Sequence, residues 1–267
     1  MLRRLAAAGA TLLLLGAASW LPALAARRPA AAAAFGDLAR PALSVPSSLP
    51  AVAGSALGAV TGLYFSLAAA VTARQTATAR PQGEAEPPAV SEDFARAYAH
   101  LAGSWRSQLP FAAFVRSWSA TRGLDLLAAL PAGAPAGEPF ARRVFVEIRT
   151  LTWVGGAAPH MALGYAYAFC VAEVETQGWL VRSAQLTPEN FGAAPSGQVP
   201  QAEAEAAAVA AARHAGRSTG DLSPRVGKAV AQSEHRLTVP VRVGEDLYTV
   251  ILYQLVDGSW VVLQTTR

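Results

Sequence analysis

The chain is poor in the residues that most often carry out chemistry in proteins. It contains one cysteine, Cys170, in 267 residues, which excludes an internal disulfide and a metal site built from several thiolates. No phosphate loop of the G-x-x-x-x-G-K-[ST] type is present. The four histidines form no H-x-x-x-H pair of the kind that binds zinc; they are His100, His160, His214 and His235. We therefore expect no metal, no cofactor and no enzymatic activity.

Positive charge is concentrated near the N-terminus. Residues 1–83 contain seven arginines and one acidic residue, whereas residues 84–267 contain 15 basic and 17 acidic residues, a balance of −2. The formal net charge of +4 therefore comes from the N-terminal part of the chain. A nucleic-acid-binding protein carries a clustered basic face, so we expect no nucleic-acid partner.

Two long, uncharged, apolar stretches lie in this N-terminal part. The first, residues 5–26, belongs to a basic segment 1–48, and the second, residues 51–73, belongs to a predicted transmembrane helix at 49–73. Each stretch is long enough to cross a hydrocarbon core of ~30 Å as a helix. The first is open to a second interpretation as a signal peptide, because Ala23-Leu24-Ala25 has the pattern of a cleavage site. The arginines directly after that site disfavour cleavage.

Small residues recur at every fourth position of the second stretch. Gly54, Gly58 and Gly62 would share one face of a helix, and Ser66 and Ala70 continue the row. In a membrane, such a face lets another helix approach closely. The three glycines are therefore the predicted sites of helix packing, with residues 5–26 or a second copy of the chain as the partner. The alternative is a chance spacing in a chain rich in alanine and glycine.

The sequence leaves the side of the membrane open. Arginines precede, separate and follow the two apolar stretches in nearly equal number, so the positive-inside rule selects no orientation. Residues 74–90 have the composition of a flexible tether. We expect a location in the cell membrane with the soluble part outside the cytoplasm. If both stretches span with the N-terminus inside, the soluble part is cytoplasmic instead.

Beyond the tether, the pattern becomes that of an α+β protein. Apolar spacing predicts a helix over residues 91–108 and a short second helix over 111–118, which ends near Gly123. Asp125 is interpreted as a turn or cap residue, and residues 131–139 as a loop. Alternating β-rich runs then predict strands at 142–154, 161–176 and 179–187.

The same order of helices and strands recurs after a boundary rich in proline and glycine at residues 188–200. Helices are predicted at 201–215 and 221–232, and strands at 235–243, 246–256 and 259–266. In both halves a β-rich run leads to a glycine in a turn and then to a tryptophan, which are Gly178-Trp179 and Gly258-Ser259-Trp260. The predicted architecture is two curved antiparallel sheets with helices packed on their concave faces.

Two segments resemble nuclear-transport-factor-2-like domains. Residues Tyr98-Ala-His-Leu-Ala-Gly-Ser-Trp105 and the continuation to Trp118 are similar to their helical opening, and Gly178-Trp179-Leu-Val-Arg182 is similar to their closing strands. The resemblance implies one such domain at 91–190 and a second, shorter one at 201–267. This fold hosts isomerases, cyclases and dehydratases as well as many non-catalytic modules, so it carries no function by itself.

Enzymes of that family place acid and base groups inside the cone between sheet and helix. For the tyrosines of this chain we favour packing with a satisfied hydroxyl over catalysis, and for His100 a solvent-exposed position. The positions that the resemblance places around the cone are the pocket candidates Tyr98, His100, Trp105, Trp118, Tyr165, Tyr167 and Phe169.

These features lead to one functional hypothesis and two alternatives. The hypothesis is a non-catalytic, membrane-anchored protein of the cell envelope that binds other envelope proteins or copies of itself. Its order of membrane helix, tether and tandem domains resembles the bitopic structural components of conjugative (type IV) secretion systems. One alternative is a small-molecule binder or isomerase/cyclase-type enzyme that uses the cone of residues 91–190. The other is a ligand-sensing accessory domain with an apolar pocket.

Overall fold

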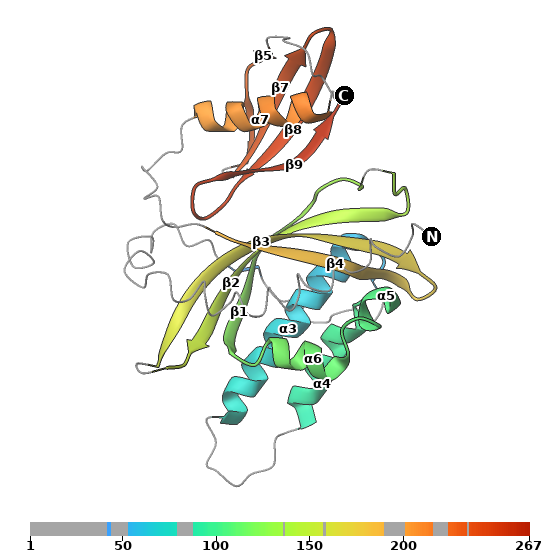
Figure 1. Ribbon diagram of the computed structural model, residues 1–267, viewed down its shortest axis with the longest axis vertical. Helices are drawn as coiled ribbons and strands as arrows, with labels where there is room; N and C mark the ends of the chain where they lie inside the picture. The colour runs from blue at the N-terminus through green and yellow to red at the C-terminus, as the bar shows by residue number, and fades with distance from the viewer. Residues whose placement is uncertain are drawn as a thin grey trace, which may run out of the picture. The chain divides into compact units, whose positions relative to one another are not determined.

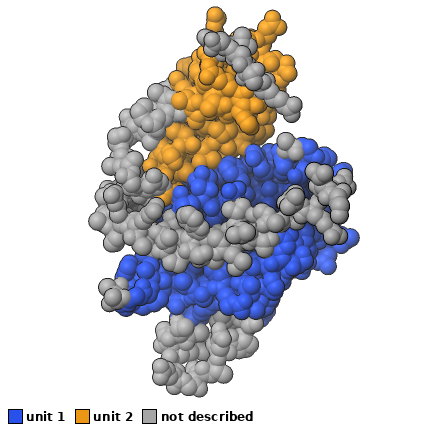
Figure 2. All heavy atoms as spheres, viewed as in Figure 1, with its two compact units in different colours: residues 1–188 blue, residues 189–267 orange. Residues whose placement is uncertain are grey.

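The computed structural model describes residues 42–43, 53–78, 88–135, 137–156, 159–189, 201–215, 224–233 and 235–267. The chain divides into two compact units, residues 1–188 and residues 189–267, which Figure 2 draws in different colours. Each unit combines helix with curved antiparallel sheet, so the predicted α+β class is confirmed. The first apolar stretch and the middle of the predicted tether lie outside the described residues.

Unit 1 contains four described helices and one four-stranded sheet. The helices are α3 (Ala56–Thr78), α4 (Pro88–Ala99), α5 (Gly103–Arg106) and α6 (Phe111–Ser117). The strands are β1 (Thr121–Pro131), β2 (Ala141–Val154), β3 (His160–Glu175) and β4 (Gly178–Pro188). The four strands are antiparallel neighbours in sequence order, and the sheet curves around α3 (Figure 1).

Helix α3 forms the centre of the core of unit 1. The side chains of Val60, Leu67 and Val71 are almost completely buried, and the helix packs against α4 and against all four strands. Its first turn is capped by Ser55, whose hydroxyl accepts a hydrogen bond from the N–H of Gly58 at 3.0 Å. The cap fixes the start of the helix inside the second apolar stretch of the sequence.

Helix α3 occupies most of the stretch predicted as a transmembrane helix at residues 49–73. Among the described residues, Ala56–Gln75 is the one helix long and apolar enough to cross a membrane, and 61% of its apolar window is buried inside the structure. The sheet covers one side of this helix and α4 covers another. A helix with neighbours on several sides is apolar around its circumference, so hydropathy does not separate it from a membrane helix.

The sheet presents its small side chains to α3. The residues of β3 that are buried on this face are Ala162, Ala166, Ala168, Cys170 and Ala172. The sulfur of Cys170 lies 3.9 Å from the hydroxyl oxygen of Tyr64 on α3, which identifies this face as the inner one. Since side chains alternate along a strand, Tyr165, Tyr167 and Phe169 lie on the opposite face of the sheet.

The helix predicted over residues 91–108 is divided in the structure. Helix α4 ends at Ala99 because the next residues pair with the edge of β4. The N–H of Val181 donates to the carbonyl of His100 at 2.8 Å, and the N–H of Ala102 donates to the carbonyl of Val181 at 2.8 Å. These bonds cover the edge of the sheet, and the chain resumes helical structure only in α5.

Strand β1 is the element of unit 1 that the sequence did not predict. Gly123 and Asp125 were interpreted as a helix end and a turn, but both lie in β1 and pair with Leu151 and Arg149 of β2. The register shifts between Thr121 and Gly123, which marks a bulge there. By contrast, the three later strands are confirmed as β2, β3 and β4, each with ends within one residue of the predicted ones.

Unit 2 packs one described helix on a five-stranded sheet. The elements are α7 (Gln201–Ala215), β5 (Arg225–Val226), β6 (Val230–Ser233), β7 (Arg236–Val243), β8 (Asp246–Gln254) and β9 (Trp260–Thr266). The strand order is β5-β7-β8-β9, and β6 also pairs with β7. Ala204, Ala208 and Ala212 form the buried face of α7, against valines of β7 and β8.

The sequence prediction for unit 2 is confirmed except for one element. Helix 201–215 and the last three strands are present, whereas the helix predicted at 221–232 is wrong, because β5 and β6 occupy that stretch. Both predicted hairpin turns are confirmed. Gly178 and Gly258 adopt positive φ angles of 108° and 86°, a region that glycine enters without steric cost.

The glycines of α3 give a direct test of its packing. A Cβ atom built on Gly62 would lie 2.6 Å from the imidazole carbon Cε1 of His100, whereas one built on Gly54 would meet nothing within 4 Å. We expect Gly62→Val to lower the free energy of unfolding of unit 1 by about 2 kcal/mol, the usual cost of overpacking a core. Urea unfolding followed by tryptophan fluorescence would measure the change.

Gly54→Val is the matched control for this experiment. Gly54 and Gly62 lie on the same face if the stretch packs against another helix in a membrane, and both substitutions would then impair that contact. The packing described for α3 predicts instead that Gly54→Val changes the free energy of unfolding by no more than about 0.5 kcal/mol. Equal effects of the two substitutions would contradict the described packing.

Candidate functional site

The structure divides the predicted pocket residues between the two faces of the sheet. Tyr98, His100, Trp105 and Trp118 lie on the helical side, where all but the partly exposed Tyr98 are buried. The remaining three candidates lie on the outer face of β3, where Tyr167 and Phe169 pack with Phe145 at ring-centroid distances of 6.1 and 5.6 Å. The two groups are therefore not brought together around one pocket.

Tyr98 makes contacts that hold neighbouring helices together. Its hydroxyl donates to the carbonyl of Leu109 at 2.8 Å, with a second carbonyl, that of Arg106, at 3.2 Å. Its ring packs against Phe111 and Phe114 of α6 at 5.3 and 5.4 Å between centroids. These contacts join α4 to the segment that leads into α6, as expected for a tyrosine with a satisfied hydroxyl.

His100 is buried rather than solvent-exposed as predicted. Its side chain is 3% exposed and its imidazole lies over Gly62 of α3. Burial disfavours the charged imidazolium and lowers the pKa of His100 below its ordinary value of 6.5. The neutral ring therefore acts as a packing group between α3 and the turn that pairs with β4.

Cys170, the one cysteine, is also a core residue. Its thiol is fully buried beneath α3, and desolvation raises its pKa to about 12. A thiol of this pKa carries almost no thiolate near neutral pH, so it is a poor nucleophile. The residue fills the narrow space between α3 and β3, as predicted for a small apolar residue.

The outer face of the sheet carries an exposed apolar surface. Antiparallel register places Leu151 opposite Leu163 and Trp153 opposite Met161, and alternation puts all four side chains on one face. Trp153, Met161 and Leu163 are 42, 38 and 40% exposed. We call these four residues the hairpin surface, because they lie at the end of the β2–β3 hairpin.

The neighbouring strand leaves the hairpin surface open. On β1 the residue opposite Leu151 is Gly123, which has no side chain to cover the leucine. The next pair along the strands is polar: Arg149 Nη2 lies 2.7 Å from Asp125 Oδ2, with both side chains partly exposed. The surface thus has an apolar centre with a charged border, as protein–protein contact sites commonly do.

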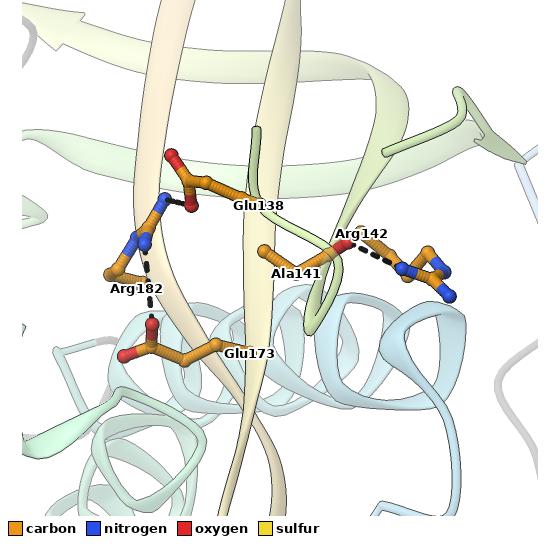
Figure 3. Close-up of polar contacts among 5 residues, drawn as sticks. All are labelled: Glu138, Ala141, Arg142, Glu173 and Arg182. Atoms are coloured by element: carbon orange, nitrogen blue, oxygen red, sulfur yellow. Dashed lines mark hydrogen bonds and ion pairs between the residues drawn. The ribbon is translucent and has the colours of Figure 1, made fainter. Parts of the chain in front are cut away.

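The opposite end of the sheet is held by ionic contacts, shown in Figure 3. Arg182 of β4 binds Glu138, in the β1–β2 connection, at 2.6 Å and Glu173 of β3 at 3.3 Å. Nearby, a guanidinium nitrogen of Arg142 donates to the carbonyl of Ala141 at 2.8 Å. Because these charges are partly exposed, each pair contributes under ~1 kcal/mol, and the cluster serves to position the connection.

No model of a known protein family matches the chain, and neither a curated protein nor a solved structure does. The resemblances to nuclear-transport-factor-2-like domains and to type IV secretion components therefore remain predictions from the quoted residues. In the part of the chain that the structure describes, no three histidine, cysteine or acidic side chains are grouped as a metal site would require.

One motif of the sequence remains outside the described residues. Residues Gly216-Arg-Ser-Thr-Gly220 match the G-x-S-x-G pattern of some serine hydrolases. In those enzymes the serine stands between a strand and a helix, whereas here the motif follows α7. The chain order therefore does not fit a nucleophile elbow.

The sequence contained a signal for the hairpin surface. The signal was the large residues on one face of residues 161–176, together with Trp153 on the adjacent strand.

The buried histidine predicts a pH-dependent stability. His100 titrates near pH 6.5 when the chain is unfolded and lower when it is folded. The contribution of the neutral His100 to the free energy of unfolding is therefore complete above about pH 6.5. It is lost as the pH falls from there towards the folded-state pKa. We expect unfolding free energies measured between about pH 7.5 and pH 5.5 to decline more in the natural chain than in His100→Gln. Identical pH profiles would contradict the buried, uncharged position.

Proposed function

We propose that this chain is a non-catalytic, membrane-anchored assembly protein of the cell envelope, which binds its partners through the hairpin surface of unit 1. The observation that carries the proposal is the exposure of Trp153, Met161 and Leu163 side by side on one face of the sheet. Clustered exposed apolar side chains of this kind mark interaction sites on soluble proteins.

The interior of unit 1 favours a binding role over a catalytic one. Side chains of α3, including Tyr64, Leu67 and Val71, occupy the inner face of the sheet where a related enzyme would hold its substrate. The titratable groups described there include His100, with its lowered pKa, and the thiol of Cys170, with its raised pKa. Both groups are uncharged near neutral pH and pack against apolar neighbours.

The membrane anchor in this proposal is the first apolar stretch, residues 5–26. Helix α3 is engaged with the sheet and with α4, so it is not free to lie in lipid. The described chain after this anchor is bonded to the sheet of unit 1 at two points: the N–H of Leu43 donates to the carbonyl of Leu126 at 2.7 Å, and the N–H of Trp179 donates to the carbonyl of Ala53 at 3.2 Å. With one anchor, retained with the N-terminus inside, both units lie outside the cytoplasm.

The partners in this proposal are other envelope proteins or further copies of the chain. Trp153 supplies a large, rigid contact, and tryptophan is enriched among the residues that dominate binding energy at interfaces. Methionine and leucine beside it adapt to the shape of a partner. A role as a structural component of a conjugative secretion system accords with this arrangement and with the resemblance in domain order.

Site-specific photocrosslinking tests this proposal. The photoreactive residue benzoylphenylalanine is placed at Trp153, in the full-length chain in its native membranes, and in a second variant at Val174, which is exposed at the other end of the sheet. We expect a discrete crosslinked species from position 153 and none from position 174. Its mass would distinguish self-association from a different partner.

The control for this test is a pair of charge substitutions. Leu163→Asp is expected to remove the crosslink from position 153 because a carboxylate would be buried in the contact. Val174→Asp is expected to leave it unchanged. The proposal would be abandoned if position 153 gave no crosslink, or if Leu163→Asp left the crosslink in place.

A further inference from the structure

The sheet of unit 2 has a second face that α7 does not cover. Along β7 and β8 the residues that pack against α7 include Val239, Val241, Val250 and Leu252. Because side chains alternate along a strand, the residues between them lie on the opposite face. We call this the outer face of unit 2, and its exposed members include Arg242 and Leu247, which are direct neighbours in the β7–β8 register.

Two arginines oppose each other on this face. Arg225 of β5 and Arg242 of β7 are direct partners in the antiparallel register, which puts their side chains on the same side of the sheet. Both are exposed. Like charges in directly opposite positions destabilise a sheet. Such an arrangement costs stability in the isolated chain and is relieved when an anion lies between the two guanidinium groups.

The described parts of the chain supply no such anion. Neither arginine forms an ion pair with a carboxylate in the ranges that the structure covers, and the nearby Asp246 is bound to Arg267 through a short contact. Glu245 lies in the exposed turn between β7 and β8 without bonding to Arg242.

Apolar side chains continue the surface on both sides of the arginine pair. Leu247 is the neighbour of Arg242 on β8 and is 49% exposed. Val230 of β6 is 58% exposed and pairs with Thr238, further along the same side of β7. This part of the outer face thus offers the Arg225–Arg242 pair between two aliphatic contacts, a pattern that suits a ligand with carboxylates beside apolar groups.

We propose that the outer face of unit 2 docks an acidic segment of a partner protein. Its carboxylates bridge Arg225 and Arg242 through charge-assisted hydrogen bonds, while its aliphatic side chains contact Leu247 and Val230. This site is independent of the hairpin surface of unit 1. It gives the chain a second contact of different chemistry.

The charge of unit 2 favours an acidic protein segment over a polyanionic surface. Residues 189–267 contain seven basic and eight acidic side chains, a balance of −1. Nucleic acids and anionic membranes are bound by extended basic surfaces, which this unit does not have. A local pair of guanidinium groups in a nearly neutral unit matches a ligand with a local pair of carboxylates.

The test uses the purified full-length chain and a synthetic amphipathic peptide of about four helical turns, with glutamates on one side and leucines beside them. Fluorescence anisotropy of the labelled peptide reports binding at low ionic strength. We expect Arg242→Gln and Arg225→Gln each to weaken binding about tenfold, the effect of losing one charge-assisted contact. Arg213→Gln, an exposed change on α7, is the matched control and is expected to bind as the natural chain does.

Thermal unfolding of the same variants provides the second readout. Since the like charges repel, Arg242→Gln is expected to raise the melting temperature of the peptide-free chain while it weakens binding. An unchanged affinity in both variants would overturn the proposal, as would a lower melting temperature, which would make Arg242 a structural residue. Equal or tighter binding to vesicles of phosphatidylglycerol, lost in the same variants, would assign the site to lipid and also overturn it.

Discussion

The packing of α3 on the small side chains of β3 is the contact on which the rest of unit 1 depends. Alanines and Cys170 on the inner face allow the helix to approach the sheet closely, and Gly62 allows His100 to lie against the other side of the same helix. Many apolar side chains of the second hydrophobic stretch are thus buried in the core of unit 1. Removing this helix would expose the inner face of all four strands.

This packing also decides which surfaces remain for partners. Because small residues face inward on β3, the large residues of the same strand face outward, and some of them remain exposed in the hairpin surface. Burial of Cys170 and His100 keeps both groups uncharged near neutral pH. Both side chains therefore act as packing groups in the core of unit 1. Unit 2 repeats the principle with the alanine face of α7, and its uncovered face carries the opposed arginines.

The sequence predicted the strands well because alternation and turn glycines are local signals. β2, β3, β4 and the hairpin turns at Gly178 and Gly258 follow from those signals alone. The side of β3 that meets the helix did not follow, since either the small or the large face can pack inward. The role of residues 49–73 was also undetermined, because a helix surrounded by protein and a helix surrounded by lipid have the same hydropathy. Strand β1 was missed because its bulge at Gly123 resembles a helix end, and the opposition of Arg225 and Arg242 depends on a register that no local pattern reveals.

The most direct test of this account is cell fractionation of a chain from which residues 2–41 have been removed, followed by urea unfolding of the product. If α3 belongs to the core of unit 1, the shortened chain is found in the soluble fraction and unfolds cooperatively, with α3 protected from proteolysis until unfolding. If residues 49–73 span the membrane, the shortened chain stays in the membrane pellet after an alkaline wash, and that result would contradict the account.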